Sequence, residues 1–282
     1  MRCGFRQARN DAKRIFNLRV TIIKMKKLCG AGILVIAILI GSENSARALN
    51  FFELEVYPYE TAGPGELELE SLNSYVVNGK REAEPGQVVT HHLWRTSLEL
   101  VYGVTDHLEA AGYLDLALTG NGRFDYAGGR LRGRYRFLEK DEIPVNLGVY
   151  AELELPNRRF DENDIEIELR LIAEKDLGPI TIQLNPIFEK SLSGEDSSVG
   201  WEFQYAAKVY YRFRPWLMPG IEVFGDVGRL TSFEPSSEQK HFIFPVVDAK
   251  LSRHLRLNTG IGFGLTSASD FTLVKLNLEY EF

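Results

Sequence analysis

Four arginines recur at every second position in the middle of this 282-residue chain: Arg130, Arg132, Arg134 and Arg136. Alternate residues of a β-strand point to the same face, so this spacing predicts a single column of guanidinium groups. Like charges about 7 Å apart repel one another, and burying them without partners is costly. The column therefore needs carboxylates on the neighbouring strands.

Carboxylates are present in the segments that we expect on both sides of the arginine column. The candidates for the same face, with one further arginine, are Glu109, Asp115, Glu152, Glu154, Glu166, Glu168 and Arg170. Register counted from the connecting turns, accurate to about two residues, places Arg130 near Glu152. The same count places Arg134 near Glu109.

Two interpretations of this charged face stay open. It could form the constriction of a narrow channel, where the arginines would select anionic or polar solutes. It could equally form a salt-bridge network that fills a small lumen. Replacing Arg132 with Glu separates the two, because a channel would become more cation-selective, whereas a filled lumen would chiefly lose thermal stability.

Catalytic chemistry is not indicated. The histidines are His91, His92, His107, His241 and His254. They show no Ser/His/Asn or His-x-Ser pattern of the outer-membrane phospholipases or lipid-A deacylases. Adjacent histidines on a strand point in opposite directions, so the one His-His pair is a poor metal site. We expect no enzyme activity, no cofactor and no metal.

A Gly-x-Gly-x-Gly run at Gly260, Gly262 and Gly264 is not a phosphate-binding loop, because it lies within a strand pattern and no helix follows. On the inward face these glycines favour open space in the lumen.

The segments that carry these residues have a period of two. Between Ile165 and Ala173, apolar residues alternate with mostly charged ones, and Trp201–Phe213 repeats the alternation. Such segments are longer than ordinary soluble strands and long enough to cross a bilayer at a tilt. About twelve are expected, at 65–77, 92–102, 107–118, 125–138, 145–155, 163–174, 179–190, 199–213, 219–228, 241–251, 255–265 and 271–282.

Short connections alternate with mostly longer ones along the chain, which is typical of bacterial outer-membrane barrels. We therefore predict an all-β fold, a transmembrane antiparallel up-and-down β-barrel of about twelve strands with both termini on the periplasmic side. Pro245 interrupts one strand, and the apolar residues shift by one position in the alternation between Phe244 and Val247, so we expect a β-bulge there.

The N-terminus predicts export. Lys26 and Lys27 precede a short apolar stretch at 28–40, and Ala46-Arg47-Ala48 offers a small-x-small cleavage site, with Met25 as the expected true start. The expected organisation is an N-terminal extension and cleaved signal peptide at 1–48, a periplasmic segment, plug or extra strand at 49–64, and the barrel at 65–282.

The charge of the chain that remains after cleavage argues against one class of partner. Residues 1–48 hold ten Lys or Arg and two Asp or Glu, so the chain from Leu49 has 23 basic and 37 acidic residues and a net charge of −14. Such a chain is a poor ligand for nucleic acid. It also holds no cysteine from Leu49 onward, which fits a bacterial envelope protein.

The last residues resemble the closing strand of bacterial outer-membrane barrels. Val274, Leu276, Leu278, Tyr280 and Phe282 alternate up to the C-terminus. In those barrels the terminal aromatic residue is recognised by the barrel assembly machinery. The resemblance implies that Tyr280 and Phe282 are an assembly signal, and it places the protein among the lipids of a Gram-negative outer membrane.

Four further stretches resemble a group of uncharacterised proteobacterial outer-membrane proteins. They are Leu54–Thr61, Glu66–Asn73, His92–Ser97 and Asn185–Lys190. More distantly, the arrangement resembles the outer-membrane barrels associated with phenol-degradation pathways. Neither resemblance assigns a substrate to any residue of this chain.

Two functions follow from the sequence. The first is a passive channel for small solutes in the outer membrane. The alternative is a non-conducting structural or ligand-binding barrel with a salt-bridge-filled lumen.

We predict that the protein is recovered with the outer membrane on cell fractionation and that its gel mobility changes on heating, because closed barrels resist unfolding in cold detergent. Recovery as a soluble periplasmic protein with heat-independent mobility would contradict the barrel.

Overall fold

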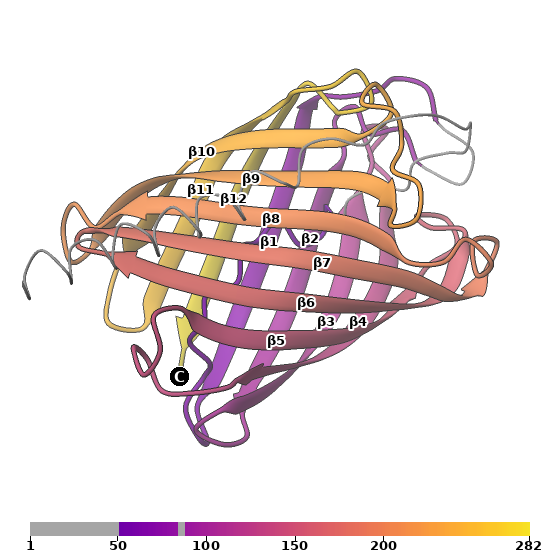
Figure 1. The fold of residues 1–282 in the computed structure, drawn as a ribbon. Helices are drawn as coiled ribbons and strands as arrows, with labels where there is room; N and C mark the ends of the chain where they lie inside the picture. Colours follow the sequence, from indigo (N-terminus) through magenta and orange to yellow (C-terminus); the bar gives the residue numbers. More distant parts are fainter. Residues whose placement is uncertain (1–50, 84–87) are drawn as a thin grey trace, which may run out of the picture. The chain divides into compact units, whose positions relative to one another are not determined.

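A computed structural model describes residues 51–83 and 88–282, and the expected signal peptide lies outside this range (Figure 1). The described chain contains twelve strands, as the alternation predicted. They are β1 (Leu67–Asn78), β2 (Trp94–Gly103), β3 (Leu108–Leu118), β4 (Phe124–Arg136), β5 (Asn146–Pro156), β6 (Asn163–Leu177), β7 (Ile180–Gly194), β8 (Glu202–Tyr211), β9 (Leu217–Arg229), β10 (Lys240–Lys250), β11 (Leu255–Gly264) and β12 (Thr272–Glu281). None of the described residues lies in a helix long and apolar enough to cross a membrane.

The twelve strands form one closed antiparallel barrel, which confirms the predicted fold. Each strand pairs with its neighbour in sequence, and β1 pairs with β12 through residues such as Leu69 and Tyr280. Closure leaves no edge strand with unpaired N–H and C=O groups. The backbone can therefore satisfy its hydrogen bonds without water along the whole wall.

The two ends of the barrel differ in the length of their connections. At one end, here called the turn end, β6 and β7 are joined by residues 178–179 alone, with Gly178 in the left-handed backbone region at φ 64°. The other end, the loop end, carries connections such as 79–93 and 230–239. The barrel begins and finishes at the turn end, where the amide of Phe282 donates to the carbonyl of Leu67 at 3.0 Å.

The wall has an apolar outer face and a largely polar inner face. Leu131, between two column arginines, is 61% exposed, whereas Arg130 and Arg132 on either side are 3% and 5% exposed. Exposed aromatic side chains lie near both ends, as with Tyr102 at the turn end and Trp94 at the loop end. This separation is the one that the period-two pattern predicted.

One expectation about the wall is wrong. The strand β10 has no bulge at Pro245, because its register with β9 and β11 runs without a shift. Phe242 and Phe244 are buried, whereas Val247 is 37% exposed. The alternation between inner and outer face therefore continues unbroken through Pro245. The two phenylalanines point inward and Val247 points outward, whereas the expected bulge would have put all three on one face.

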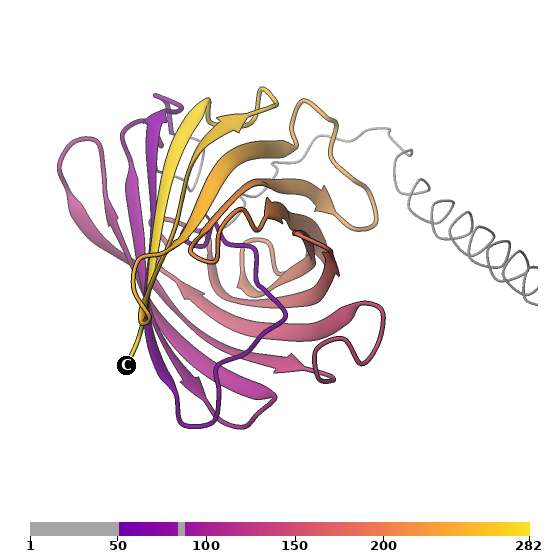
Figure 2. The same ribbon diagram turned by 90° about the vertical axis from the view of Figure 1, so that its left-hand side faces the viewer.

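Residues 51–64, here called the lumenal segment, cross the inside of the barrel without forming a strand (Figure 2). Its backbone is held by inward side chains from several strands. The carbonyl of Phe51 accepts from Ser74 of β1, the amide and carbonyl of Tyr57 bond Asn185 of β7, and the amide of Ala62 donates to Glu109 of β3. The sequence had left a plug, a tail and an extra strand open for this region.

Apolar side chains of the lumenal segment pack against apolar side chains on the inner face of the wall. Phe51, Leu54 and Val56 join a buried apolar cluster on the inner face of β1, β7–β10 and β12. The ring of Phe51 meets that of Phe242 edge-on, with centroids 5.3 Å apart. The lumen is therefore not charged throughout, since it also contains a packed hydrophobic cluster.

The inward glycines of β11 do not leave open space. A Cβ atom built on Gly262 would lie 2.2 Å from the ring of Phe244, so the glycine makes room for that ring. The expectation of an empty lumen beside β11 is wrong for this reason.

We predict that Gly262→Ala lowers the free energy of unfolding by about 1–3 kcal/mol, because the buried Phe244 ring must move out of its packed position. The matched control is Gly112→Ala, whose Cβ would meet only Leu131 at 3.5 Å. Urea titration of the folded barrel measures both. Equal stability of the two variants would show that the Phe244 ring is not confined.

Candidate lumenal charge site

The arginine column lies on the inner face of β4, as its spacing predicted. Arg130, Arg132 and Arg134 are buried, whereas Arg136 is partly exposed at the turn end. The strand extends here because small or apolar residues, such as Leu131, alternate with the arginines. The first three arginines therefore project into the lumen from one wall.

Arg130 is held by carboxylates from three directions. Its Nε donates to Asp115 of β3 at 3.0 Å, and its Nη1 donates to Glu152 of β5 at 3.1 Å. The third partner is Glu53 of the lumenal segment, which accepts from the same Nη1. Arg130 thus ties the lumenal segment to two adjacent strands.

Arg132 and Arg134 share carboxylates on the β2–β3 side. The Nε of Arg132 donates to Glu99 at 2.7 Å, and its Nη1 donates to Glu109. Arg134 donates to Glu109 at 2.9 Å. Residue Glu109 lies opposite Arg134 in the ladder, at the register that the turn count gave.

The observed register between β4 and β5 differs by two residues from the register that we counted from the turn. Glu154 lies opposite Arg130, and Glu152 lies opposite Arg132. The contact between Arg130 and Glu152 still forms, because a guanidinium reaches diagonally along the strand.

Arg136 takes no part in the buried network that these residues form. Its Nε donates to the carbonyl of Asp106 at 2.7 Å, and its Nη1 contacts Glu139 at 2.9 Å, both in turns. Glu139 is largely exposed. Arg136 therefore belongs to the turn end and not to the middle of the lumen.

The strand β6 supplies the second cationic wall. Arg170 contacts Glu168 on its own strand at 2.8 Å and Glu53 at 3.0 Å. Glu166, nearer the loop end, accepts from Asn163 at 3.1 Å. Arg130 and Arg170 therefore approach Glu53 from strands on the two sides of β5.

Three tyrosines between the arginines were not singled out from the sequence. The guanidinium of Arg130 lies 3.9 Å from the ring centroid of Tyr113, and that of Arg170 lies 4.8 Å from those of Tyr57 and Tyr150. Such contacts add attraction between cation and ring. Tyr113 and Tyr150 share the strand alternation of the inner face, so the pattern could have identified them.

Glu53 was also missed, and no pattern marked it. It lies in the lumenal segment, which has no strand periodicity, and its side chain is 1% exposed. Its importance depends on where the segment runs, which only the folded chain defines.

A second buried charge group lies across the lumen on β8–β10 and β12. Lys275 contacts Glu222, and Lys208 contacts Glu222 and Asp248 at 3.1 and 2.7 Å. The ammonium of Lys275 also donates to the carbonyl of Leu54 at 3.0 Å. The lumenal segment is therefore anchored to charges on both walls.

The middle of the lumen is filled by protein. Glu99 and Glu109 are 0% exposed, and Tyr57 and Tyr150 are 1% exposed. Water does not reach these side chains from either end. Within residues 51–83 and 88–282, no group of three or more His, Cys, Asp or Glu is arranged to hold a metal ion.

A cavity of about 610 Å³ lies at the loop end. Its lining includes Arg81, His91, His92 and Arg159. Partial burial and the nearby charge of Arg81 lower the pKa of His91. Arg159 forms an ion pair with Asp125 at 3.0 Å.

At the turn end, Lys140 lies near three acidic side chains: Glu60, Glu174 and Asp176. Burial by itself would lower the pKa of Lys140, but the carboxylates outweigh it and raise the pKa. The ammonium therefore stays charged and contacts Glu60 beside the end of the lumenal segment.

No protein-family description matches the chain, and no curated protein sequence matches it. Solved structures do share its fold. An outer membrane channel from Pseudomonas putida F1 superposes with a TM-score of 0.54 and 17% identity, over 81% of this chain and all of that one. The KdgM porin in complex with disordered oligogalacturonate gives 0.52 and 9%, over 76% and 99%. The NanC porin gives 0.52 and 6%, over 77% and 100%. At these identities the likeness concerns the closed barrel fold.

We predict that Arg132→Glu lowers the free energy of unfolding by about 3–5 kcal/mol, because Glu99 and Glu109 lose their cation and face a third carboxylate. The control Arg136→Glu should cost less than about 1 kcal/mol, since that site is partly open to solvent. Chemical denaturation of both variants measures the difference. A shift toward cation selectivity with unchanged stability would instead identify a water-filled constriction.

Proposed function

We propose that this protein is an outer-membrane barrel that passes small solutes passively and that the lumenal segment acts as its plug. The observation that carries the proposal is a closed barrel with an apolar outer face and an inner wall rich in charges. Such a wall suits an aqueous path through hydrocarbon.

The outer face supports a membrane location. Leu100, Leu131, Leu171 and Ile261 each expose half or more of their surface on different strands. A belt of this kind is unfavourable in water and suits lipid. In the proposed orientation, the turn end and both termini of the barrel are periplasmic, and the signal peptide and the terminal Phe282 direct export and assembly.

The fold supports transport as the function class. The KdgM porin, which shares the fold, is described in complex with oligogalacturonate. We infer by analogy that small polar solutes are the substrates here. The more distant resemblance of the arrangement to barrels of phenol-degradation pathways remains a hypothesis and assigns no solute.

The lumenal segment is suited to leave its place. Residues 51–64 form no strand, so their removal breaks no ladder of the wall. Their anchors are individual side chains, such as Asn185 on Tyr57 and Ser74 on Phe51. Displacing the segment would expose the inner faces of Arg130 and Arg170 to water without opening the barrel.

The second candidate is a non-conducting structural or ligand-binding barrel. The filled middle of the lumen favours it, because buried ion pairs at Glu99 and Glu109 leave no room for solute. The two functions differ in whether the segment ever moves.

We predict discrete conductance steps in planar lipid bilayers for the wild-type protein and their loss when the segment is tethered. Tyr57→Cys with Asn185→Cys puts cysteines at two residues that are joined by hydrogen bonds between the Asn185 amide group and the Tyr57 backbone, and the chain has no other cysteine after Cys29. Oxidation should abolish the steps and reduction should restore them, because only the disulfide holds the segment in the lumen.

The single variants Tyr57→Cys and Asn185→Cys are the controls, and oxidant should leave their conductance unchanged. Steps that persist in the fully oxidised double variant would reject the plug. Silence of the folded wild type and of the reduced double variant would favour the non-conducting barrel.

A further inference from the structure

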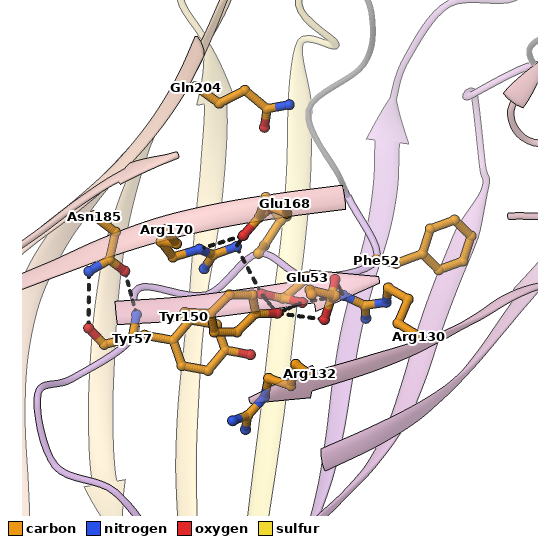
Figure 3. Close-up of polar contacts among 12 residues, drawn as sticks. Phe52, Glu53, Tyr57, Arg130, Arg132, Tyr150, Glu168, Arg170, Asn185 and Gln204 are labelled. Atoms are coloured by element: carbon orange, nitrogen blue, oxygen red, sulfur yellow. Dashed lines mark hydrogen bonds and ion pairs between the residues drawn. The ribbon is translucent and has the colours of Figure 1, made fainter. Parts of the chain in front are cut away.

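The carboxylate of Glu53 occupies a site built by residues that do not belong to its own segment (Figure 3). One oxygen accepts from Arg130 of β4, and the other lies 3.0 Å from Nη2 of Arg170 on β6. The hydroxyl of Tyr150, on the strand between them, donates to Glu152 at 2.5 Å and lies 3.4 Å from the first oxygen of Glu53. The donors that converge on the Glu53 carboxylate are therefore the two guanidinium groups.

Both arginines pack against rings of the wall. Arg130 lies 3.9 Å from the ring centroid of Tyr113, and Arg170 lies 4.8 Å from that of Tyr150. Arg170 also lies over Tyr57 of the lumenal segment, whose ring is tilted by 42° to that of Tyr150 with centroids 5.0 Å apart. The side chains of Arg130, Arg170 and Glu53 are 1–4% exposed. Guanidinium groups whose rotamers are fixed by packing are well placed to bind a carboxylate without further ordering.

The two arginines hold Glu53 in addition to acidic partners on the wall. Asp115 and Glu152 also contact Arg130, and Glu168 also contacts Arg170. Each arginine still directs an N–H group at the Glu53 carboxylate. The geometry therefore provides a place for one carboxylate beyond those of the wall.

Glu53 is held only through the lumenal segment, whereas its two cationic partners belong to the barrel wall. When the segment leaves, Arg130 and Arg170 stay in place and lose one carboxylate. A free carboxylate of similar size could then take the same contacts, and it would compete with the return of Glu53.

We propose that Arg130 and Arg170 form a binding subsite for the carboxylate of a small organic acid, which Glu53 occupies when the lumen is plugged. The inference rests on the proposed channel function and names its substrate class. A solute carboxylate that binds here displaces Glu53, so the solute itself favours the open lumen.

The test uses propionate, a small organic acid, as the probe on the variant Glu53→Ala. The truncation removes Cγ and the carboxylate of Glu53 from between the two arginines. We expect propionate at about ten times its dissociation constant to raise the Tm of this variant by about 3–5 °C. Propionamide, its neutral isostere, at the same ionic strength set with sodium chloride, should give no shift.

The matched control variant is Glu53→Gln, which keeps the volume of the side chain and fills the space. Propionate should leave its Tm unchanged. Equal shifts of Glu53→Ala with propionate and propionamide, or equal shifts of the Ala and Gln variants with propionate, would overturn the subsite.

A second measurement serves if Glu53→Ala does not fold. In planar bilayers, sodium propionate should increase the open time of the wild-type channel at least threefold over sodium chloride of equal conductivity, and propionamide should not. Equal open times would overturn the competition. A propionate-specific Tm shift of Glu53→Ala in a barrel that never conducts would reject the channel and keep the carboxylate subsite.

Discussion

The pairing of β1 with β12 is the constraint on which the rest of the structure depends. It satisfies the last free row of backbone N–H and C=O groups and turns the sheet into a wall with two separate sides. Only a closed wall lets one side be apolar, as at Leu131, while the adjacent Arg132 is withdrawn from solvent. The charge network follows, because every inward side chain must find its partners within the lumen.

Those partners come from the wall and from the chain that precedes it. Arg132 is satisfied within the wall by Glu99 and Glu109, whereas Arg130 and Arg170 also use Glu53 of the lumenal segment. The permanent pairs hold the strands in register. The pairs with Glu53 connect the wall to the lumenal segment, which is not part of the sheet. In the proposed mechanism a solute carboxylate competes with Glu53 for these pairs.

The lumenal segment meets the arginine column on one side and an apolar cluster on the other. Its carboxylate at Glu53 faces the arginines, and Leu54 and Val56 join the apolar cluster with Phe224 and Phe244. Lys275 and Glu222 form an ion pair on the strands of that cluster, and Lys275 also donates to the carbonyl of Leu54. Apolar packing contributes stability in proportion to the area removed from water, while buried ion pairs mainly fix position.

The sequence by itself determined the strands, their faces and the arginine column, because period two and turn chemistry are local properties of the chain. It also placed Glu109 opposite Arg134 by counting from the turn. It could not place Glu53, because that residue lies in a segment without strand periodicity. It could not show that Phe242 and Phe244 point inward, because an apolar residue suits a lipid-facing position and a buried cluster equally well. Only the tertiary structure decided that the lumen is filled, since that depends on where residues 51–64 run relative to strands far away in sequence.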